Sequence, residues 1–267
     1  MPHPHEPRFA RFFEHLRTYY NHDTDLNSLA EAAHLSPWHW HRLYHHTVGA
    51  TLHATRKWMR LHRAAWLLTH SDKSVADIAA DVGYTGNAQS FARTFRAAYG
   101  MTPHRYRQQP PRSDYSVEIV RVAAIPLLCL DHYGDYQRLA DSYTKLQSLL
   151  VLRGQLPPTP RIFSLCFDDE ADVHPAQLRA RIGIAGQHPQ PAAPLVADRV
   201  PAGRYAILHY HGALADIDRA FTWFYEQWLP QSDVQDAPAA TGIIEYLTTP
   251  FDTPPGEQHA DLYIRLI

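Results

Sequence analysis

Apolar residues recur at helical spacing between residues 74 and 107, in two runs separated by a glycine. The apolar positions of the first run share one helical face, and they are Val75, Ile78, Ala79 and Val82. Ser74 and Asp77 form a capping box where this helix begins. Gly83 can adopt a positive φ angle, so the chain can turn there into a second helix. The apolar positions of that helix are Phe91, Phe95 and Tyr99. The pattern predicts a helix-turn-helix.

Gln89 and Arg93 lie one turn apart on another face of the second helix. An amide and a guanidinium placed in this way can hydrogen-bond to the edges of base pairs in the major groove of DNA. Two ordinary core helices with solvated polar faces would show the same period and the same caps. The pattern by itself therefore leaves DNA binding and simple helix packing as alternatives.

The order DIA, VGY, SFARTFR, YG and TPHRYR resembles the second helix-turn-helix signature of AraC/XylS-type transcription regulators, whose DNA-binding unit contains two such motifs. An earlier stretch, LAEAAHLSPWHWHRLYHHTVG, resembles their first motif, with one helix at residues 26–34 and another that starts at Ser36-Pro37. The resemblance implies that the base-contacting residues are Trp38, His41 and Arg42 in the first motif, and Gln89 and Arg93 in the second.

Residues 52–69 contain neither proline nor glycine, and they are predicted to form one long helix between the two motifs. Such a helix would be a rigid spacer. Two recognition helices held about one DNA turn apart, ~34 Å, can enter successive major grooves from a single chain. We therefore expect residues 1–107 to form an all-α domain that binds double-stranded DNA.

The proline-containing polar segment 108–113 predicts a linker, after which the pattern changes to short apolar strands. Within residues 114–267, VAAIPLLCLDHYG (122–134) aligns without gaps on VPAGRYAILHYHG (200–212), a repeat at an offset of 78 residues. Each copy predicts a strand, a helix and two further strands. The helices are predicted at 136–152 and 213–229, and the further strands at 161–167, 178–185, 242–247 and 260–267. Two β-α-β-β units can pair into one antiparallel sheet with a cleft at their seam, so the expected fold class is multidomain, all-α followed by α+β.

Residues 114–267 resemble the GyrI-like family of small-molecule-binding domains through HYG and HYHG, VPAGRYAIL and EYLTTPFDTPPGEQHADLYIRL. The resemblance implies a small aromatic or lipophilic effector, a strand glutamate that meets its positive charge, and aromatic side chains that stack on it. Glu245 is the candidate glutamate. If YLTTP is aligned without a gap, the family position falls instead on Ile244, whose side chain points to the opposite face of the strand. Which of the two faces the cleft stays open, and an exposed strand carboxylate is the alternative for Glu245.

Aromatic residues on the predicted strands and the second predicted helix are candidates for the walls of this site. We expect Tyr133, Tyr205, Trp223 and Tyr246 to contact the ligand. Ordinary core packing explains aromatic residues at strand or helix spacing equally well.

The net charge of −2 conceals an asymmetry along the chain. Residues 1–113 hold 14 Lys and Arg against 8 Asp and Glu, whereas residues 114–267 hold 11 against 19. A basic first part fits nucleic-acid binding. No run approaches 18 apolar residues, and the start, MPHPHEPRFARFF, lacks a basic segment followed by an apolar core, so we expect a cytoplasmic protein with no membrane partner.

His41 and His45, one turn apart on a predicted helix, raise the question of a metal site. Two ligands on one turn cannot complete a tetrahedral zinc site, and no cysteine pair or HEXXH pattern accompanies them. Cys129 and Cys166 each lie in an apolar run and are expected to be buried thiols. We therefore expect neither a metal nor a cofactor.

These observations favour a transcription regulator over an enzyme. Its first domain would bind promoter DNA, and its second would bind an effector that alters DNA affinity or contacts with RNA polymerase. Two alternatives remain for the second domain. It could be a hydrolase with Glu245 as general base, although no nucleophile elbow, metal set or phosphate loop accompanies that residue. It could also be a module that binds a partner protein.

Overall fold

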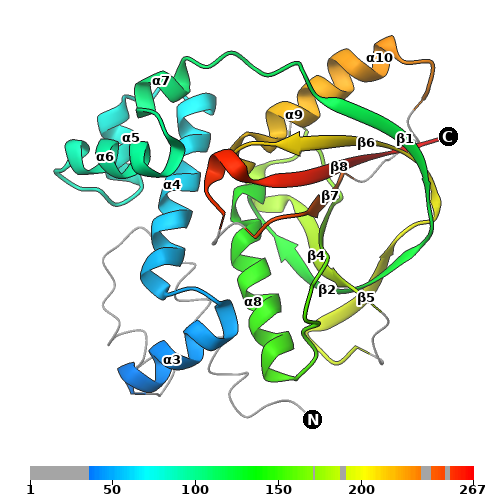
Figure 1. Ribbon diagram of the computed structural model, residues 1–267, viewed down its shortest axis with the longest axis horizontal. Coiled ribbons are helices and arrows are strands. Elements are labelled where there is room, and N and C mark those ends of the chain that lie inside the picture. Colours follow the sequence, from blue (N-terminus) through cyan, green and yellow to red (C-terminus); the bar gives the residue numbers. More distant parts are fainter. Residues whose placement is uncertain (1–35, 171, 187–190, 236–241, 250–252) are drawn as a thin grey trace. The chain divides into compact units, whose positions relative to one another are not determined.

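The computed structural model describes residues 36–170, 172–186, 191–235, 242–249 and 253–267 (Figure 1). Contacts divide the chain into two compact units, and their main boundary lies between Pro110 and Pro111. The helix predicted at residues 26–34 lies outside the described residues, so only the second helix of the first predicted motif can be examined.

The described part of the first unit is helical. Its helices are α3 (Pro37–Val48), α4 (Leu52–His70), α5 (Val75–Asp81), α6 (Ala88–Tyr99) and α7 (Pro103–Arg107). Helix α4 is the long connecting helix that the sequence predicts, and Thr51 caps it by accepting a hydrogen bond from the backbone N–H of Ala54. Helix α7 was not predicted. Thr102 caps its start, and its Tyr106 packs edge-on against Phe95.

The corner between α5 and α6 confirms the predicted helix-turn-helix. The hydroxyl of Ser74 accepts a hydrogen bond of 3.1 Å from the backbone N–H of Asp77 and so caps α5. Gly83 has a φ angle of 88°, and Asn87 caps α6 through a 2.8 Å hydrogen bond from the N–H of Ser90. The two helices then bury one shared apolar set, which contains Ile78, Val82, Phe91 and Phe95.

Replacing Gly83 with alanine is expected to destabilise this corner. A side chain at a φ of 88° meets its own backbone, at a cost of about 1–2 kcal/mol. Thermal unfolding monitored by calorimetry would measure the loss. Gly256→Ala is a matched control, since a Cβ atom there meets nothing within 4 Å and Gly256 is not among the glycines with positive φ. An equal, small effect of both substitutions would contradict this account of the turn.

The second unit is built on one eight-stranded antiparallel sheet with the order β1-β6-β8-β7-β3-β4-β2-β5. Its strands are β1 (Ser116–Val122), β2 (Ile125–Tyr133), β3 (Ile162–Cys166), β4 (Arg179–Ala185), β5 (Leu195–Val200), β6 (Gly203–His211), β7 (Gly242–Tyr246) and β8 (His259–Leu266). The predicted repeat is confirmed, because β2 with β3 and β4 in the first copy matches β6 with β7 and β8 in the second. Strands β3 and β7 meet at the seam between the copies.

The helical segments after residue 110 follow β2 and β6, as predicted. After β2 the chain forms a short 3-10 turn, η1 (Tyr136–Arg138), and then α8 (Leu139–Leu152). After β6 it forms η3 (Leu214–Asp216), α9 (Ile217–Trp223), a π-helical turn η4 (Phe224–Trp228) and α10 (Leu229–Gln231). Two further 3-10 turns, η2 (Pro175–Gln177) and η5 (Pro255–Glu257), precede β4 and β8.

Strands β1 and β5 were not predicted, and they are exchanged between the copies. Strand β1 belongs to the first copy but pairs with β6 of the second, and β5 pairs with β2 in the same reciprocal way. Only Ala123 and Ala124 join β1, at one edge of the sheet, to β2, its seventh strand. That link can span at most about 11 Å, whereas six inter-strand steps in a flat sheet would cover about 29 Å. The sheet must therefore curl strongly, as Figure 1 shows.

The two faces of the curled sheet carry separate apolar clusters. The helix-covered face holds Ala206, Leu208, Ile244, Leu262 and Ile264 together with Ala220 and Phe224 from the α9–η4 segment. The opposite face, which we call the inner face, holds Phe163, Leu165, Tyr205, Ile207, Ile243 and Tyr263, together with Leu127, Cys129 and Val200. Because strand side chains alternate between faces, each strand contributes its odd and even positions to different clusters.

Candidate functional site

One face of α6 carries the two residues predicted to read bases in the second motif. Phe91 and Phe95 are fully buried, so the helix is fixed by its apolar side. Gln89 and Arg93, four residues apart, are exposed beside each other. Neither side chain has a hydrogen bond or ion pair with another described residue, so both can reach an external partner.

Helix α3 carries the predicted readers of the first motif. Tyr44 is buried and anchors the helix, whereas His41 and Arg42 are exposed. Trp38 is 69% exposed, an unusual state for a tryptophan side chain. The guanidinium carbon of Arg42 lies 4.5 Å from the centroid of the Trp38 ring. This cation–π contact orients the arginine before any partner is present.

In the second unit, the strand register places Ile244 and Glu245 on opposite faces of the sheet. Ile244 is part of the apolar cluster on the helix-covered face. Glu245 therefore points the other way, with Ile243, onto the inner face. There Phe163 lies directly opposite it on β3. The residue beside the aromatic side chains of the inner face is thus Glu245.

Glu245 is only 5% exposed, and both of its carboxylate oxygens have partners. Arg161 donates from Nε to Oε1 at 2.7 Å and from Nη2 to Oε2 at 3.1 Å, and the hydroxyl of Tyr263 donates to Oε2 at 2.6 Å. The hydrogen bonds with Glu245 raise the pKa of Arg161, and burial followed by the Glu245 contact raises the pKa of Tyr263. Arg161 stays a cation and Tyr263 stays a neutral donor at neutral pH.

The other predicted ligand residues do not gather around Glu245. Tyr205 is buried on the inner face, where its ring meets Tyr263 edge-on at 5.9 Å. Trp223 and Tyr246 pack against the cluster on the helix-covered face. Tyr133 lies at the end of β2 and is 71% exposed. Of the aromatic candidates, Tyr205 is the one that is buried on the same face as Glu245.

Sequence reasoning missed Arg161, Tyr263 and Phe163, which surround Glu245. Tyr263 lies on a strand that was predicted, and Phe163 on another, but their contact with Glu245 depends on the pairing of β3, β7 and β8. One feature of the sequence could have pointed to Arg161, namely its position at the start of the strand predicted at 161–167. A basic residue there is a natural partner for a buried acid once the two strands pair.

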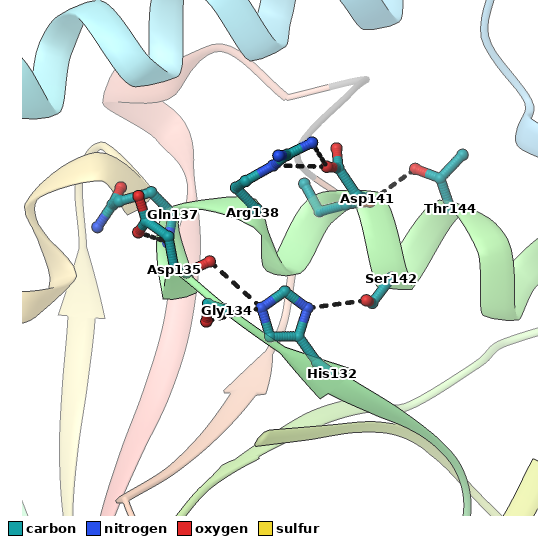
Figure 2. Close-up of polar contacts among 9 residues, drawn as sticks. His132, Gly134, Asp135, Gln137, Arg138, Asp141, Ser142 and Thr144 are labelled. Carbon is teal, nitrogen blue, oxygen red and sulfur yellow. Dashed lines mark hydrogen bonds and ion pairs between the residues drawn. The ribbon is translucent and has the colours of Figure 1, made fainter. Parts of the chain in front are cut away.

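A second polar cluster lies where β2 meets α8, and Figure 2 shows it around His132. The imidazole is buried, with Nδ1 2.9 Å from Oγ of Ser142 and Nε2 3.1 Å and 3.2 Å from the carbonyl oxygens of Gly134 and Asp135. Carbonyl oxygens only accept hydrogen bonds, so Nε2 carries the proton and Nδ1 accepts from the serine hydroxyl. The pair has the contact that a serine nucleophile makes with its base.

The second copy of the repeat indicates a structural role for this pair. His132 corresponds to Tyr210, whose hydroxyl donates to the carbonyl of Ala213, the counterpart of Asp135, at 2.6 Å. Ser142 corresponds to Ala220, which is fully buried. Both copies thus tie the end of a strand to the same carbonyl of the following turn, with histidine and serine in one copy and tyrosine and alanine in the other.

Because of His132, the stability of the folded protein is expected to decrease as the pH is lowered. Burial lowers the pKa of this imidazole below its ordinary value of 6.5. Between the lowered pKa of the folded state and 6.5, His132 binds a proton in the unfolded chain but not in the folded chain. This contribution to stability is therefore present above pH 6.5 and is lost as the pH falls below it. Calorimetric unfolding across this range should show a smaller pH dependence for His132→Gln. An unchanged pH dependence of stability in His132→Gln would contradict the assignment.

Two further features bear on function. Among the described residues, no group of three or more His, Cys, Asp or Glu side chains is arranged to hold a metal ion. Two histidine contacts lie on the sheet, where a ring nitrogen of His209 is 2.7 Å from the carboxylate of Asp261 and the ring of His211 stacks on that of His259. In the same described part of the chain, no helix combines the length and the apolar character needed to cross a bilayer.

Comparison with protein-family models gives two matches. Residues 29–109 match a helix-turn-helix domain, and residues 115–267 match the GyrI-like small molecule binding domain. The second match extends over more than half of the chain.

Comparison with individual proteins finds regulators related through part of their length. The regulatory protein PocR of Salmonella typhimurium is 32% identical over 108 residues, which are 40% of this chain and 35% of PocR. The bifunctional transcriptional activator/DNA repair enzyme AdaA of Bacillus subtilis is 40% identical over 83 residues, which are 31% of this chain and 39% of AdaA. The chain thus spans well under half of either relative. Among solved structures, the EcmrR C-terminal domain matches with a TM-score of 0.46 and 11% identity, over 58% of this chain and 98% of that one.

Proposed function

This chain belongs to the family of GyrI-like small molecule binding domains and also carries an AraC-type helix-turn-helix region, and we propose that it is a transcription regulator controlled by a small effector. Residues 1–107 bind promoter DNA, residues 108–113 link the two parts, and residues 114–267 bind the effector. The effector changes the affinity for DNA or the contacts with RNA polymerase.

The observation that carries this proposal is the exposed polar face of α6, directly after the glycine corner of the helix-turn-helix. Gln89 can pair with adenine and Arg93 with guanine through two hydrogen bonds each, a geometry that distinguishes base pairs in the major groove. In the first motif, Trp38, His41 and Arg42 take the corresponding role. The exposed indole of Trp38 supplies an apolar surface for a thymine methyl group, and it orients Arg42.

For the effector we propose a small aromatic or lipophilic molecule that binds beside the inner face of the sheet. Two features of the second unit support this. On the inner face, Phe163 and Tyr263 lie beside a buried carboxylate and Tyr205 packs edge-on against Tyr263, which is the mixture of apolar area and few polar groups found in ligand sites. Residues 115–267 also match a domain family described as small-molecule binding.

The proposed role of the second domain is regulation and not catalysis. The Ser142–His132 pair resembles a nucleophile with its base. Its counterpart in the second copy, Ala220 with Tyr210, keeps the same structural tie without a nucleophile. AdaA is described as a DNA repair enzyme as well as a transcriptional activator, but it matches this chain over only 83 residues.

A DNA selection followed by an effector screen tests the proposal. The full chain should enrich a defined duplex sequence from a random library, with an affinity that falls steeply as salt rises, because phosphate counterions are released on binding. Aromatic compounds that raise the thermal stability of the full chain should then change its affinity for that duplex. Binding to all duplexes alike would contradict sequence-specific regulation. Turnover of a compound that leaves DNA affinity unchanged would favour a hydrolase.

A further inference from the structure

We propose that Arg161 sets the charge class of the effector, because it occupies the carboxylate of Glu245 and so excludes cationic ligands in favour of uncharged aromatic ones. This inference rests on the proposed function, since it concerns the ligand that the second domain would bind. Arg161 acts here as an internal competitor: a residue of the chain fills the position that the charge of a cationic ligand would need.

The first argument is that Glu245 has no free oxygen to offer. Nε and Nη2 of Arg161 reach one carboxylate oxygen each, at 2.7 Å and 3.1 Å. This two-pronged pairing is the strongest form of arginine–carboxylate contact, because the planar fork of the guanidinium matches the carboxylate. Tyr263 adds a third donor at 2.6 Å. A ligand cation would have to break these contacts before making its own.

The second argument is the position of Arg161 between Glu245 and solvent. The side chain of Arg161 is 54% exposed, whereas that of Glu245 is 6% exposed. A molecule that approaches the carboxylate from solvent therefore meets the guanidinium first. The arginine is also held in place. Its guanidinium carbon lies 5.3 Å from the centroid of the Phe163 ring, and its backbone carbonyl accepts a 2.9 Å hydrogen bond from Ala185.

The third argument is the charge that a ligand would meet. Glu245 and Arg161 together are neutral, so a second cation gains no net attraction from this pair and is repelled by the exposed guanidinium. Asp261, directly opposite Glu245 on β8, has a partner of its own, because His209 contacts it at 2.7 Å. An uncharged aromatic ligand needs neither carboxylate. Binding of such a ligand leaves the ion pair intact.

A matched pair of probes tests this inference on the full chain. N-methyl-4-phenylpyridinium is an aromatic cation, and 4-methylbiphenyl is its uncharged isostere. Dissociation constants for both are measured by calorimetry with the wild type, Arg161→Met, and the double variant Arg161→Met, Glu245→Gln. Methionine keeps an apolar stem of similar length and removes the charge and the hydrogen-bond donors of the guanidinium. We expect the wild type to prefer the uncharged probe.

In Arg161→Met, affinity for the cation should rise about tenfold or more, and affinity for the uncharged probe should change by less than about twofold. The double variant should lose the gain, since it lacks the carboxylate. If Arg161→Met is too unstable for titration, added cation should raise its thermal midpoint and should not raise that of the double variant, which also supports the inference.

Two results would overturn it, and they differ in what they say about effector binding. If the wild type prefers the cation and Arg161→Met gains nothing, Arg161 does not select the charge of the ligand, while the proposed effector site stands. If neither probe binds or stabilises any of the three folded proteins, both the selection by Arg161 and the aromatic effector site beside the inner face are wrong.

Discussion

Replacement of Arg93 by alanine is expected to weaken binding of the preferred duplex by about 1–3 kcal/mol, which is roughly a 5- to 150-fold rise in the dissociation constant. The reason is geometric. Arg93 is exposed on a helix whose buried side is fixed by Phe91 and Phe95, so its guanidinium can present two donors to the acceptors of one guanine. The same substitution should relax the preference at a single base position. Fluorescence anisotropy with a panel of duplexes that differ at one position measures both effects.

The control separates base reading from loss of positive charge. Arg204 is an exposed arginine on β6, and Arg204→Ala removes the same charge from the second unit. It should change neither affinity nor base preference. A loss caused by Arg93→Ala that is equal on every duplex would assign Arg93 to a phosphate. Arg42→Ala is the corresponding test in the first motif, and unchanged specificity after both substitutions would contradict reading by two motifs.

The helical elements could be predicted from sequence because their signals are local. The capping box joins Ser74 to Asp77, only three positions later, and the positive φ of Gly83 depends on one residue. The same holds for the faces of α6, since the spacing of Phe91 and Phe95 already separates the buried side from Gln89 and Arg93. The separation was correct because propensity, caps and apolar period all agree in this segment.

The sheet could be predicted only in part, because its decisive contacts join distant segments. The internal repeat gave the two copies and their principal strands. The repeat could not predict that the edge strands β1 and β5 each pair with a strand of the other copy. The sequence alignment likewise left Ile244 and Glu245 as alternatives, since a shift of one residue turns a strand side chain to the other face. Arg161 lies 84 residues from Glu245, and only the pairing of β3 with β7 brings them together.

Removal of Arg161 is expected to destabilise the protein more than removal of its partner. In Arg161→Met, Glu245 stays buried with Tyr263 as its one remaining described donor, and a buried charge that loses its partner costs about 2–4 kcal/mol of unfolding free energy. In Glu245→Gln, the half-exposed Arg161 can turn to water, and Tyr263 can still donate to the amide oxygen, so the expected loss is about 1 kcal/mol. The two losses differ because only one of the charges has access to solvent.

The double variant gives this asymmetry a sharper test than either single change. If the cost of Arg161→Met comes from the unpaired carboxylate, the added Glu245→Gln should recover part of the lost stability, so the two losses should be strongly non-additive. Calorimetric unfolding of the three variants measures this directly. Arg199→Met, which removes an exposed arginine on β5, is the control for loss of charge alone and should change stability by less than about 0.5 kcal/mol. If the double variant is no more stable than Arg161→Met, the stability comes from the packing of Arg161 on Phe163 and not from its charge.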